Sequence, residues 1–220
     1  MVSQVIQEAR DKQIRLAKYV DLSSFKGNHD LIAGADISFN LGDDVVFAAI
    51  VVLSLKSAEV LEKVHVAERI AFPYIPGYLS FREVPPLLLA WDKLKNKPGI
   101  VILDGHGLIH PRRFGLACHF GLEAKVATMG CAKKPFVGNF DMPGEERGSF
   151  TPVTVDGEVR GFAYRSRVKV KPVYISPGTG MSLMDCLQFA QLSTGKYRLL
   201  EPTRQAHMYS NEMRALQCTG

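Results

Sequence analysis

The first part of the chain shows two different periods of apolar and polar residues. Residues 3–19 carry apolar side chains at approximate helical spacing among Gln, Glu, Arg and Lys, which predicts a surface helix. Segments 31–39, 45–55 and 59–66 are instead rich in β-branched and apolar residues, which is typical of strands. Because the short, turn-rich segment 40–44 joins the first two, we predict an antiparallel meander of three strands.

The rest of the chain alternates helical and strand patterns. The run Ile100–Leu103 is apolar throughout, which is typical of a strand buried on both faces. Ser80 and Glu83 have the spacing of a capping box at the start of a helix, whereas Pro85-Pro86 would suit the first turn of a helix that begins later. A meander followed by such alternation predicts an α/β fold in which helices cover a mixed sheet. The expected helices cover 79–94, 113–124, 181–192 and 202–216, and the expected strands cover 100–103, 125–129 and 173–176, with a hairpin around residues 156–157.

Composition excludes some classes of protein. The 220 residues are 46% hydrophobic and 22% charged, and no repeat or polar linker interrupts them, so we expect one globular domain over residues 1–220. The longest apolar run, 45–55, is shorter than the roughly 18 residues of a membrane span, and the N-terminus lacks an apolar signal core. We therefore expect a cytoplasmic protein with no membrane partner. The net charge of +5 favours anionic partners such as nucleic acid without establishing one, and four scattered cysteines without a C-x-x-C pair indicate neither a zinc site nor disulfides.

Three acidic residues stand where a mixed sheet builds its sites. Asp36 lies among small and apolar neighbours in a predicted strand, and Asp104 ends the apolar strand and is followed by Gly105-His106-Gly107. Glu83 is expected on the first turn of a helix. Each acid taken singly is more often a cap, a turn former or a surface charge. Three carboxylates at one sheet edge would repel each other unless a divalent ion lay between them, so together they indicate a site for Mg²⁺ or Mn²⁺.

These acids also belong to a wider set of motifs. The motifs are Gly34-Ala35-Asp36-Ile37-Ser38-Phe39, Pro73-Tyr74-Ile75-Pro76-Gly77-Tyr78-Leu79-Ser80-Phe81-Arg82-Glu83, Asp104-Gly105-His106-Gly107, His110-Pro111-Arg112-Arg113-Phe114-Gly115 and Cys131-Ala132-Lys133-Lys134-Pro135. In order and spacing, from Asp36 to the segment 201–204, this set closely resembles the endonuclease V family of inosine-specific nucleases. The resemblance implies a ribonuclease H-like α/β fold, with an antiparallel meander plus parallel strands and helices on both faces.

The resemblance assigns roles to the acids and to three basic residues. Asp36, Glu83 and Asp104 are implied to be the metal-binding acids of a Mg²⁺-dependent phosphodiesterase, with Mn²⁺ as an alternative ion. His207 stands where the family carries a histidine or an acid, so it is a candidate to complete the metal shell. Lys133 matches the family's active-site lysine, and a positive charge there would bind the scissile phosphate. His110 is a further catalytic candidate that would orient a water or a phosphate.

A rigid apolar loop is the second part of the resemblance. Two prolines stiffen the segment around Tyr74, Ile75 and Pro76, and the resemblance makes these residues a wedge that fills the gap left by an extruded base. The alternative from the residues alone is a buried turn that packs Tyr74 and Ile75 into the core. The resemblance places the pocket for the flipped base at Gly77, Leu79 and Gly105.

The implied reaction is endonucleolytic. Members of the family cut the second phosphodiester bond on the 3′ side of deoxyinosine in DNA, which leaves 3′-hydroxyl and 5′-phosphate ends and serves repair of deaminated adenine, and some prefer inosine in RNA. We expect a monomer acting on deoxyinosine-containing DNA, with inosine-containing RNA left open. The alternatives are another ribonuclease H-like nuclease, such as a junction resolvase, which would need a dimer, and a non-catalytic inosine-binding module, which would lack an acid.

Two points remain open from the sequence. Arg112 and Arg113 would either contact phosphate or staple the fold. Thr179-Gly180 replaces a His-Arg pair that is common in the family, which would weaken backbone binding or shift substrate preference if those positions face the nucleic acid.

Overall fold

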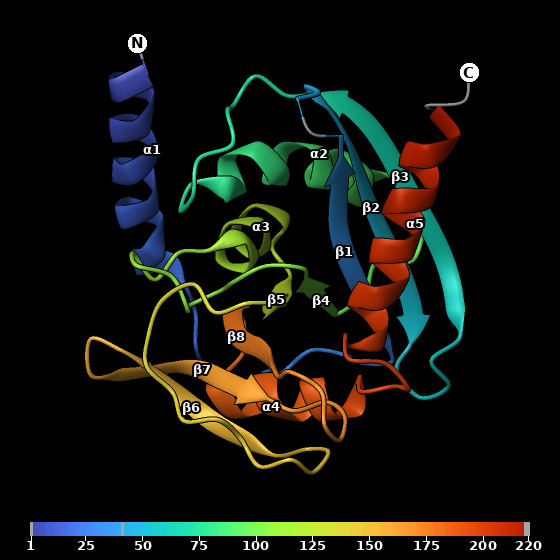
Figure 1. Cartoon of the computed structure of the whole chain (residues 1–220). Helices are drawn as coiled ribbons and strands as arrows, with labels where there is room; N and C mark the ends of the chain where they lie inside the picture. The colour runs from blue at the N-terminus through green and yellow to red at the C-terminus, as the bar shows by residue number, and fades with distance from the viewer. Residues whose placement is uncertain (1, 41, 218–220) are drawn as a thin grey trace.

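One eight-stranded sheet organises the chain, and the computed structural model describes residues 2–40 and 42–217 of it (Figure 1). The strand order is β3-β2-β1-β4-β5-β8-β7-β6. The strands are β1 Leu31–Phe39, β2 Val45–Ser54, β3 Val60–Arg69, β4 Ile100–Leu103, β5 Ala127–Ala132, β6 Phe150–Val155, β7 Glu158–Tyr164 and β8 Val173–Thr179. The helices are α1 Val2–Leu16, a 3₁₀ turn over Ala17–Tyr19, α2 Leu79–Lys93, α3 Leu116–Ala124, α4 Leu183–Leu192 and α5 Glu201–Gln217.

The sheet is mixed, as the sequence predicts. β1, β2 and β3 form the antiparallel meander, with Leu31 opposite Ser54 and Phe39 opposite Val46. β4 then pairs parallel to β1, and β5 pairs parallel to β4, because α2 and α3 return the chain to the same end of the sheet. β8 pairs antiparallel to β5 and joins the β6–β7 hairpin. The α/β fold with a meander, parallel strands and flanking helices is thereby confirmed.

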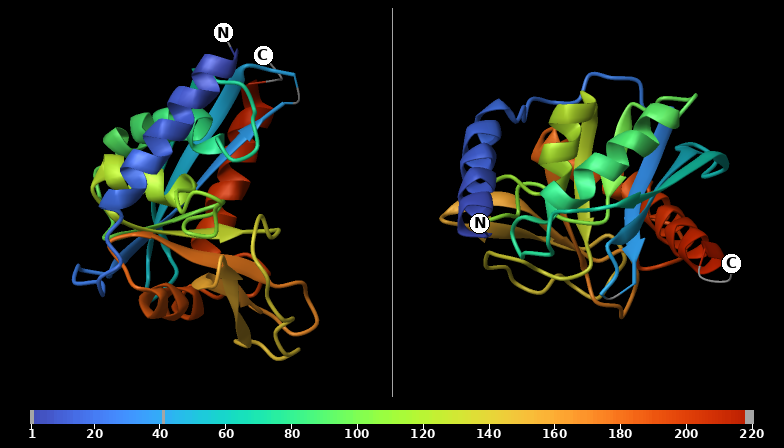
Figure 2. Two further views of the ribbon diagram at one scale, coloured as in Figure 1. Left: turned by 90° about the vertical axis from the view of Figure 1, so that its left-hand side faces the viewer. Right: turned by 90° about the horizontal axis from the view of Figure 1, so that it is seen from above.

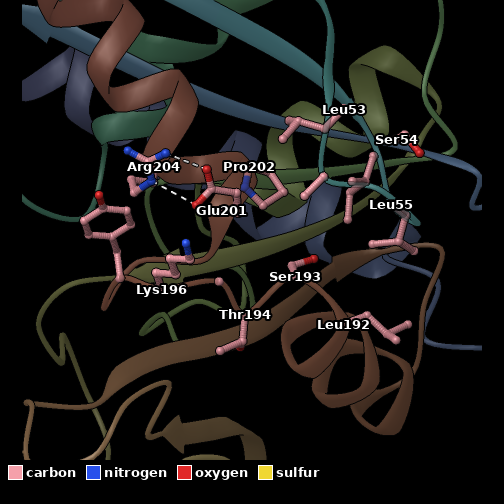
Figure 3. Close-up of a pocket in the computed structure, with 14 residues that line it drawn as sticks. Leu53, Ser54, Leu55, Leu192, Ser193, Thr194, Lys196, Glu201, Pro202 and Arg204 are labelled. Atoms are coloured by element: carbon pink, nitrogen blue, oxygen red, sulfur yellow. Dashed lines mark hydrogen bonds and ion pairs between the residues drawn. The ribbon is translucent and has the colours of Figure 1, made fainter.

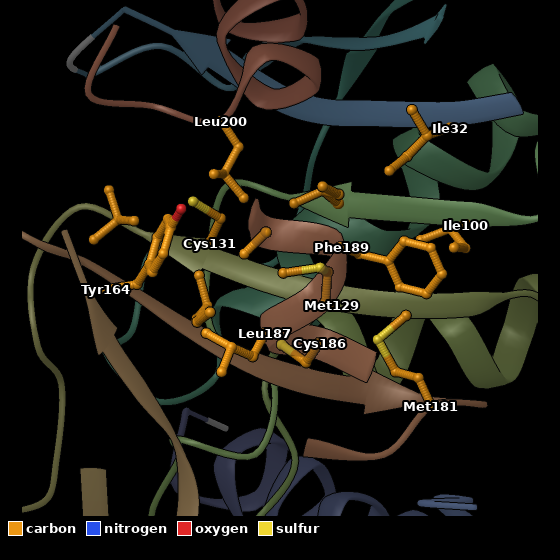
Figure 4. Close-up of a cluster of buried hydrophobic side chains, with 14 of the residues drawn as sticks. Ile32, Ile100, Met129, Cys131, Tyr164, Met181, Cys186, Leu187, Phe189 and Leu200 are labelled. Carbon is orange, nitrogen blue, oxygen red and sulfur yellow. The ribbon is translucent and has the colours of Figure 1, made fainter. Parts of the chain in front are cut away.

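Helices cover both faces of the sheet, and α2 and α5 lie on opposite sides of it (Figure 2). On one face, α2 and α3 bury Val84, Leu87 and Phe120 against the sheet. On the other, α4 contributes Phe189 to a cluster that includes Met129 from β5, and α5 also packs there (Figure 4). The central strand β4 is buried at all four positions because helices press on it from both sides.

The start of α2 differs from the capping-box prediction. The helix is capped at Tyr78 without any side-chain hydrogen bond, so Ser80 lies inside the first turn and its buried hydroxyl has no partner. Glu83 is therefore in the second turn rather than the first. Pro85 and Pro86 lie in the helix interior, where each removes a backbone donor. The helix continues through them because its apolar face is buried against the sheet.

Other boundaries shift by a few residues. α3 begins at Leu116 rather than Arg113, because Arg113 has a φ of +55° and Gly115 is extended at the N-cap. Lys125 ends that helix in the left-handed conformation, so β5 starts at Ala127 and runs on to Ala132. A capping box does occur at α4, between Ser182 and Asp185, which the sequence analysis did not identify.

The Thr179-Gly180 substitution lies in the scaffold. Thr179 is buried opposite Thr128 at the start of β5, and its hydroxyl accepts a hydrogen bond from the backbone of Asp21 at 3.0 Å. Gly180 has a φ of +68°, which favours glycine. These two residues therefore connect the N-terminal segment to the sheet, toward the opposite end of β5 from Lys133.

The described cysteines are free thiols, and the described helices are unlike membrane spans. Cys118, Cys131 and Cys186 are buried free thiols, and burial raises the pKa of Cys118 and Cys131 to about 12. Cys218 lies outside the described residues. No helix within residues 2–40 and 42–217 combines the length and apolarity that a membrane crossing requires.

Candidate active site

Asp36 and Asp104 meet because their strands are parallel neighbours. Asp36 is in the middle of β1, and Asp104 is the first residue after β4, at the end toward which both strands run. The backbone N–H of Asp104 donates to the carbonyl of Ala35 at 3.0 Å, which continues the β1–β4 pairing by one residue. The two carboxylates are thus brought together by the register of two strands, as the sequence analysis expected of a carboxyl end.

α5 adds a histidine to these acids. His207 Nδ1 lies 2.9 Å from Asp36 Oδ2, and the Ser210 hydroxyl donates to the same oxygen at 3.0 Å. Ligand atoms of Asp36, Asp104 and His207 all lie within 4.8 Å of one another. Ser210 was not identified from the sequence, although its position three residues after His207 on one helix face is a signal for it.

Glu83 borders this group without joining it. Its side chain is buried, and among the described residues it is not part of the 4.8 Å cluster. Burial raises the pKa of Glu83 well above its ordinary value, and the negative charges of Asp36 and Asp104 raise it further. The neighbouring Arg82 guanidinium acts in the opposite direction and does not cancel these effects. Glu83, the third predicted acid, is therefore close enough to interact electrostatically with Asp36 and Asp104.

Lys133 supplies a positive charge beside the acids. It follows β5 directly, and its ammonium forms an ion pair with Asp104 Oδ2. Burial and the charge of Asp36 raise the pKa of Asp104, whereas the Lys133 ammonium opposes that rise. One cation does not balance three carboxylates in this position.

The residues fit a divalent cation. Carboxylate oxygens and one imidazole nitrogen form the donor set, and two of the three carboxyl groups have raised pKa values because they are buried near like charges. A cation among them would offset both the burial and the repulsion. Asp36, Asp104 and His207 are the residues that could hold it, with Glu83 beside them.

A separate pocket adjoins the acids. It has a volume of about 250 Å³, and all three residues predicted for the base pocket, Gly77, Leu79 and Gly105, line it. Tyr74 and Pro76 also line it, and Tyr74 is 62% exposed. The alternative in which Tyr74 packs into the core is therefore wrong for this residue, and Ile75 is half-buried.

The Pro76-Gly77 turn is held in place by hydrogen bonds from three side chains to the backbone carbonyl of Gly77. Gly77 has a φ of +82°, which favours glycine, and its oxygen accepts hydrogen bonds from Gln13 Nε2 at 3.0 Å, His110 Nε2 at 3.0 Å and Arg112 Nη2 at 2.7 Å. The Arg112 guanidinium also lies over the Tyr78 ring, 4.4 Å from its centroid. Arg112 thus staples this loop, and Arg113 forms an ion pair with Glu158, so the structure assigns both arginines to the scaffold.

His110 belongs to the pocket rather than to the acidic cluster. Its Nδ1 accepts from the backbone N–H of Arg112 at 3.2 Å, so its Nε2 carries the hydrogen that bonds to Gly77. Burial, reinforced by the positive charge of Arg112, lowers the pKa of His110 to about 4, which keeps the ring neutral. His106, which the sequence analysis left without a role, also lines the pocket and stacks on Phe136.

Comparisons with known proteins agree with this arrangement. A sequence model of the family described as Endonuclease V matches residues 14–208. The chain is 44% identical to the endonuclease V of Gloeobacter violaceus over 211 residues, which cover 94% of this chain and 86% of that protein. Its fold matches the crystal structure of endonuclease V from Streptomyces avermitilis with a TM-score of 0.90 and 37% identity, over 97% of this chain and 93% of that one.

A further solved structure includes nucleic acid. It is endonuclease V from Ciona intestinalis in complex with a 24mer DNA containing an inosine followed by a ribo-adenosine, and it matches with a TM-score of 0.83 and 25% identity over 96% of this chain and 98% of that one. The motif resemblance found in the sequence is confirmed by the family match and by the 44% identical relative. The chain therefore belongs to the endonuclease V family of nucleases.

Proposed function

We propose that this protein is a Mg²⁺-dependent endonuclease that recognises inosine in nucleic acid and cuts the second phosphodiester bond on its 3′ side. The products would carry 3′-hydroxyl and 5′-phosphate ends, and the reaction would serve repair of deaminated adenine in DNA. Mn²⁺ would replace Mg²⁺. The Ciona relative was crystallised with inosine-containing DNA, which supports inosine as the recognised base.

One observation carries the proposal. Asp104 belongs to the acidic cluster and Gly105, the next residue, lines the pocket. A base held in the pocket would therefore place the nearby sugar-phosphate backbone beside the acids. This adjacency explains how recognition of one base would select a bond close to it.

The side chains would divide the work at the phosphate. Asp36, Asp104 and His207 would hold the cation, with Glu83 as a further ligand once the cation offsets its burial. A bound Mg²⁺ supplies a polarised water and relief for the charge on the phosphate and the leaving oxygen. His207 and Ser210 hold the carboxylate of Asp36 in one orientation. Lys133, held against Asp104, would offer its ammonium to the phosphate oxygens.

The pocket would read an extruded base. The Gly77 turn is fixed by three donors before any base arrives, so little ordering would be required on binding. Tyr74, exposed at the pocket rim, would stack in the gap that the base leaves, with Ile75 and Pro76 as the rest of the wedge. A non-catalytic inosine-binding module is disfavoured because all three acids are present.

Matched strands test the proposal. DNA and RNA strands of one sequence, with inosine or adenine at a single position, would be incubated with the protein and Mg²⁺, and the products mapped to single-nucleotide resolution. We expect cleavage only of inosine strands, at the second bond on the 3′ side, with 5′ ends that a ligase can join. Equal cleavage of adenine strands would refute the specificity, and the ratio of rates on DNA and RNA decides the preferred polymer.

A further inference from the structure

An open hollow beside the loop that follows α4 is lined by three exposed cations. They are Arg147, Arg167 and Lys196, and Val168, Thr194 and Gly195 complete the lining. We call these six residues the basic hollow. No acidic residue lines it, and Glu145 and Glu146, next to Arg147 in the sequence, form no ion pair with it within the described part of the chain. Three like charges thus line one space whose own lining contains no acidic residue.

The cations of the hollow make few contacts within the described part of the chain, whereas nearby Arg165 makes several. Among residues 2–40 and 42–217, Arg167 and Lys196 have no hydrogen bond or ion pair, and Arg147 uses one nitrogen on the carbonyl of Thr194 at 2.8 Å. Arg165, by contrast, donates to the carbonyls of Gly144, Pro143 and Val170. Structural arginines thus fix the loops, and the cations of the hollow remain available to a ligand.

The adjoining pocket contains charges of both signs. It shares the loop residues 194–196 with the basic hollow, and beside Lys196 its lining holds an ion pair (Figure 3). Arg204 pairs with both carboxylate oxygens of Glu201 and lies over the Tyr197 ring, 4.4 Å from its centroid. Leu53 and Leu55 form an apolar wall on the other side. The hollow differs from this pocket in that no acidic residue lines it, which indicates an anionic partner.

Arg198 connects the hollow to the active site. Its guanidinium donates to the carbonyl of Lys133 at 2.6 Å, and also to those of Lys171 and Pro172 at 2.9 and 2.8 Å. Arg198 thereby ties together the loop that carries Lys196, the loop that carries Arg167, and the end of β5 that carries Lys133. The three cations sit on loops fixed relative to the catalytic lysine.

We infer that the basic hollow binds backbone phosphates of the nucleic-acid strand outside the cleavage site, so that the strand extends from Lys133 over Arg198 to these cations. The inference rests on the proposed function in that it takes nucleic acid as the substrate. Base identity would not matter there, because exposed guanidinium and ammonium groups contact phosphate and carry no sequence information. The hollow would add affinity and fix the register of long substrates.

Salt dependence tests the inference. The triple variant Arg147→Gln, Arg167→Gln, Lys196→Gln would be compared with wild type for binding of a long adenine-containing single strand, which needs no inosine and no cleavage. If each cation neutralises one phosphate, the slope of log affinity against log salt should become shallower by about 2, since each single-strand contact contributes roughly 0.7. Between 50 and 200 mM salt, wild-type affinity should then fall roughly twentyfold more than that of the variant.

A charge-matched control separates the hollow from net charge. Lys26, Lys95 and Lys125 are exposed and precede β1, β4 and β5, at the ends of these strands away from Asp36 and Asp104, so their triple replacement by Gln removes the same charge elsewhere. An equal change in slope for this control would overturn the inference. The double variant Arg167→Gln, Lys196→Gln removes no hydrogen bond, so a partial loss there shows that the effect does not come from misfolding of the loop.

Strand length provides the second arm. Inosine strands shortened toward the lesion should reach a length below which wild type and the triple variant bind equally, because the strand no longer reaches the hollow. A constant difference at all lengths would contradict the proposed path. If no inosine strand is cleaved but the triple variant still changes the salt slope on the adenine strand, the proposed function is wrong and the inference about the hollow holds. If inosine strands are cleaved as proposed but the triple variant leaves the salt slope unchanged, the inference about the hollow is wrong and the proposed function holds.

Discussion

At the scale of single residues, the role proposed for Lys133 makes the sharpest prediction. Its ammonium forms an ion pair with Asp104 at the end of β5, and its backbone carbonyl accepts a hydrogen bond from Arg198. Lys133→Ala should slow the single-turnover cleavage rate by about 10²-fold or more, as expected for removing a charge that stabilises the transition state. Affinity for the inosine strand should change much less.

A lysine elsewhere provides the control for this variant. Lys95 is exposed and has no side-chain ion pair among the described residues, so Lys95→Ala should leave both quantities unchanged. Loss of affinity with an unchanged single-turnover rate in Lys133→Ala would instead assign Lys133 to substrate positioning.

The exposed ring of Tyr74 makes a second residue-level prediction. Tyr74→Ala should weaken the complex with duplex inosine DNA by roughly 1–3 kcal/mol, the value of one base-stacking contact. The loss should be smaller for an inosine in a single strand, where little unstacking is required. Because the side chain is 62% exposed, the melting temperature should stay within about 1 °C of wild type. Tyr74→Phe keeps the ring and should bind like wild type, and equal losses on both substrates would rule out a wedge.

Residues of the site differ in how far the sequence reveals them. Asp36 and Asp104 are visible because each ends or interrupts an apolar strand pattern, and parallel neighbours place such residues together. Gln13 and Arg198 could not be found this way. Gln13 reaches Gly77 across 64 positions of sequence, and Arg198 reaches Lys133 across 65, so their partners are set by packing between distant elements.

At the scale of elements, the contact between α2 and α3 contains a buried histidine. His119 on α3 packs against the rings of Phe81 and Phe114, and its Nδ1 has no partner. Burial lowers the pKa of His119 to about 3, and the positive charge of Lys12 lowers it further. Glu123, 3.6 Å from Nε2, is shared with Lys12 at 3.5 Å and does not offset the burial.

This histidine makes the pair of helices sensitive to acid. Between pH 6.5 and about 3 the unfolded chain binds a proton at His119 that the folded chain does not, so stability falls as pH falls through this range. The slope from this one group is about 1.4 kcal/mol per pH unit. In His119→Phe, the free energy of unfolding should depend on pH less steeply by this amount. Urea unfolding of wild type and variant at pH 7 and pH 5 would measure the difference. An identical pH dependence in wild type and variant would show that His119 is not held neutral.

Element boundaries show where sequence patterns stop being informative. The strands of the meander and the interior of β4 are predicted within a few residues, because burial on one or both faces leaves a clear period. The starts of α2 and α3 are not. At α2 the packing of the apolar face retains Pro85 and Pro86 inside the helix, and at α3 the left-handed backbone of Arg113 delays the start. Both are tertiary effects that local propensity does not contain.

At the scale of the whole molecule, the fold places two kinds of surface side by side. The middle of β1 carries Asp36, the end of β4 leads to Asp104, and the turn after β4 passes directly into the wall of the pocket. α5 then returns along β1 to deliver His207. The site therefore combines residues from five segments that are distant in sequence, namely β1, α2, the turn after β4, the end of β5 and α5.

Cation binding should consequently stabilise the whole fold. Mg²⁺ at 100 times its dissociation constant should add about 2.7 kcal/mol to the free energy of unfolding, since a ligand bound only to the native state stabilises by mass action. Thermal unfolding with Mg²⁺ and with a chelator measures this. Asp36→Asn should remove the difference, and an equal Mg²⁺ effect in that variant would place the cation elsewhere.

The most direct test of the central claim is single-turnover cleavage of an inosine strand by wild type and by Asp104→Asn, at saturating Mg²⁺ and saturating protein. The substitution removes a ligand charge while preserving the volume of the side chain. The proposed function predicts that wild type cuts the second bond 3′ to inosine. With Asp104 as a metal ligand, Asp104→Asn should bind the strand with a cleavage rate reduced by about 10³-fold or more. Cleavage by Asp104→Asn within about tenfold of wild type would contradict it.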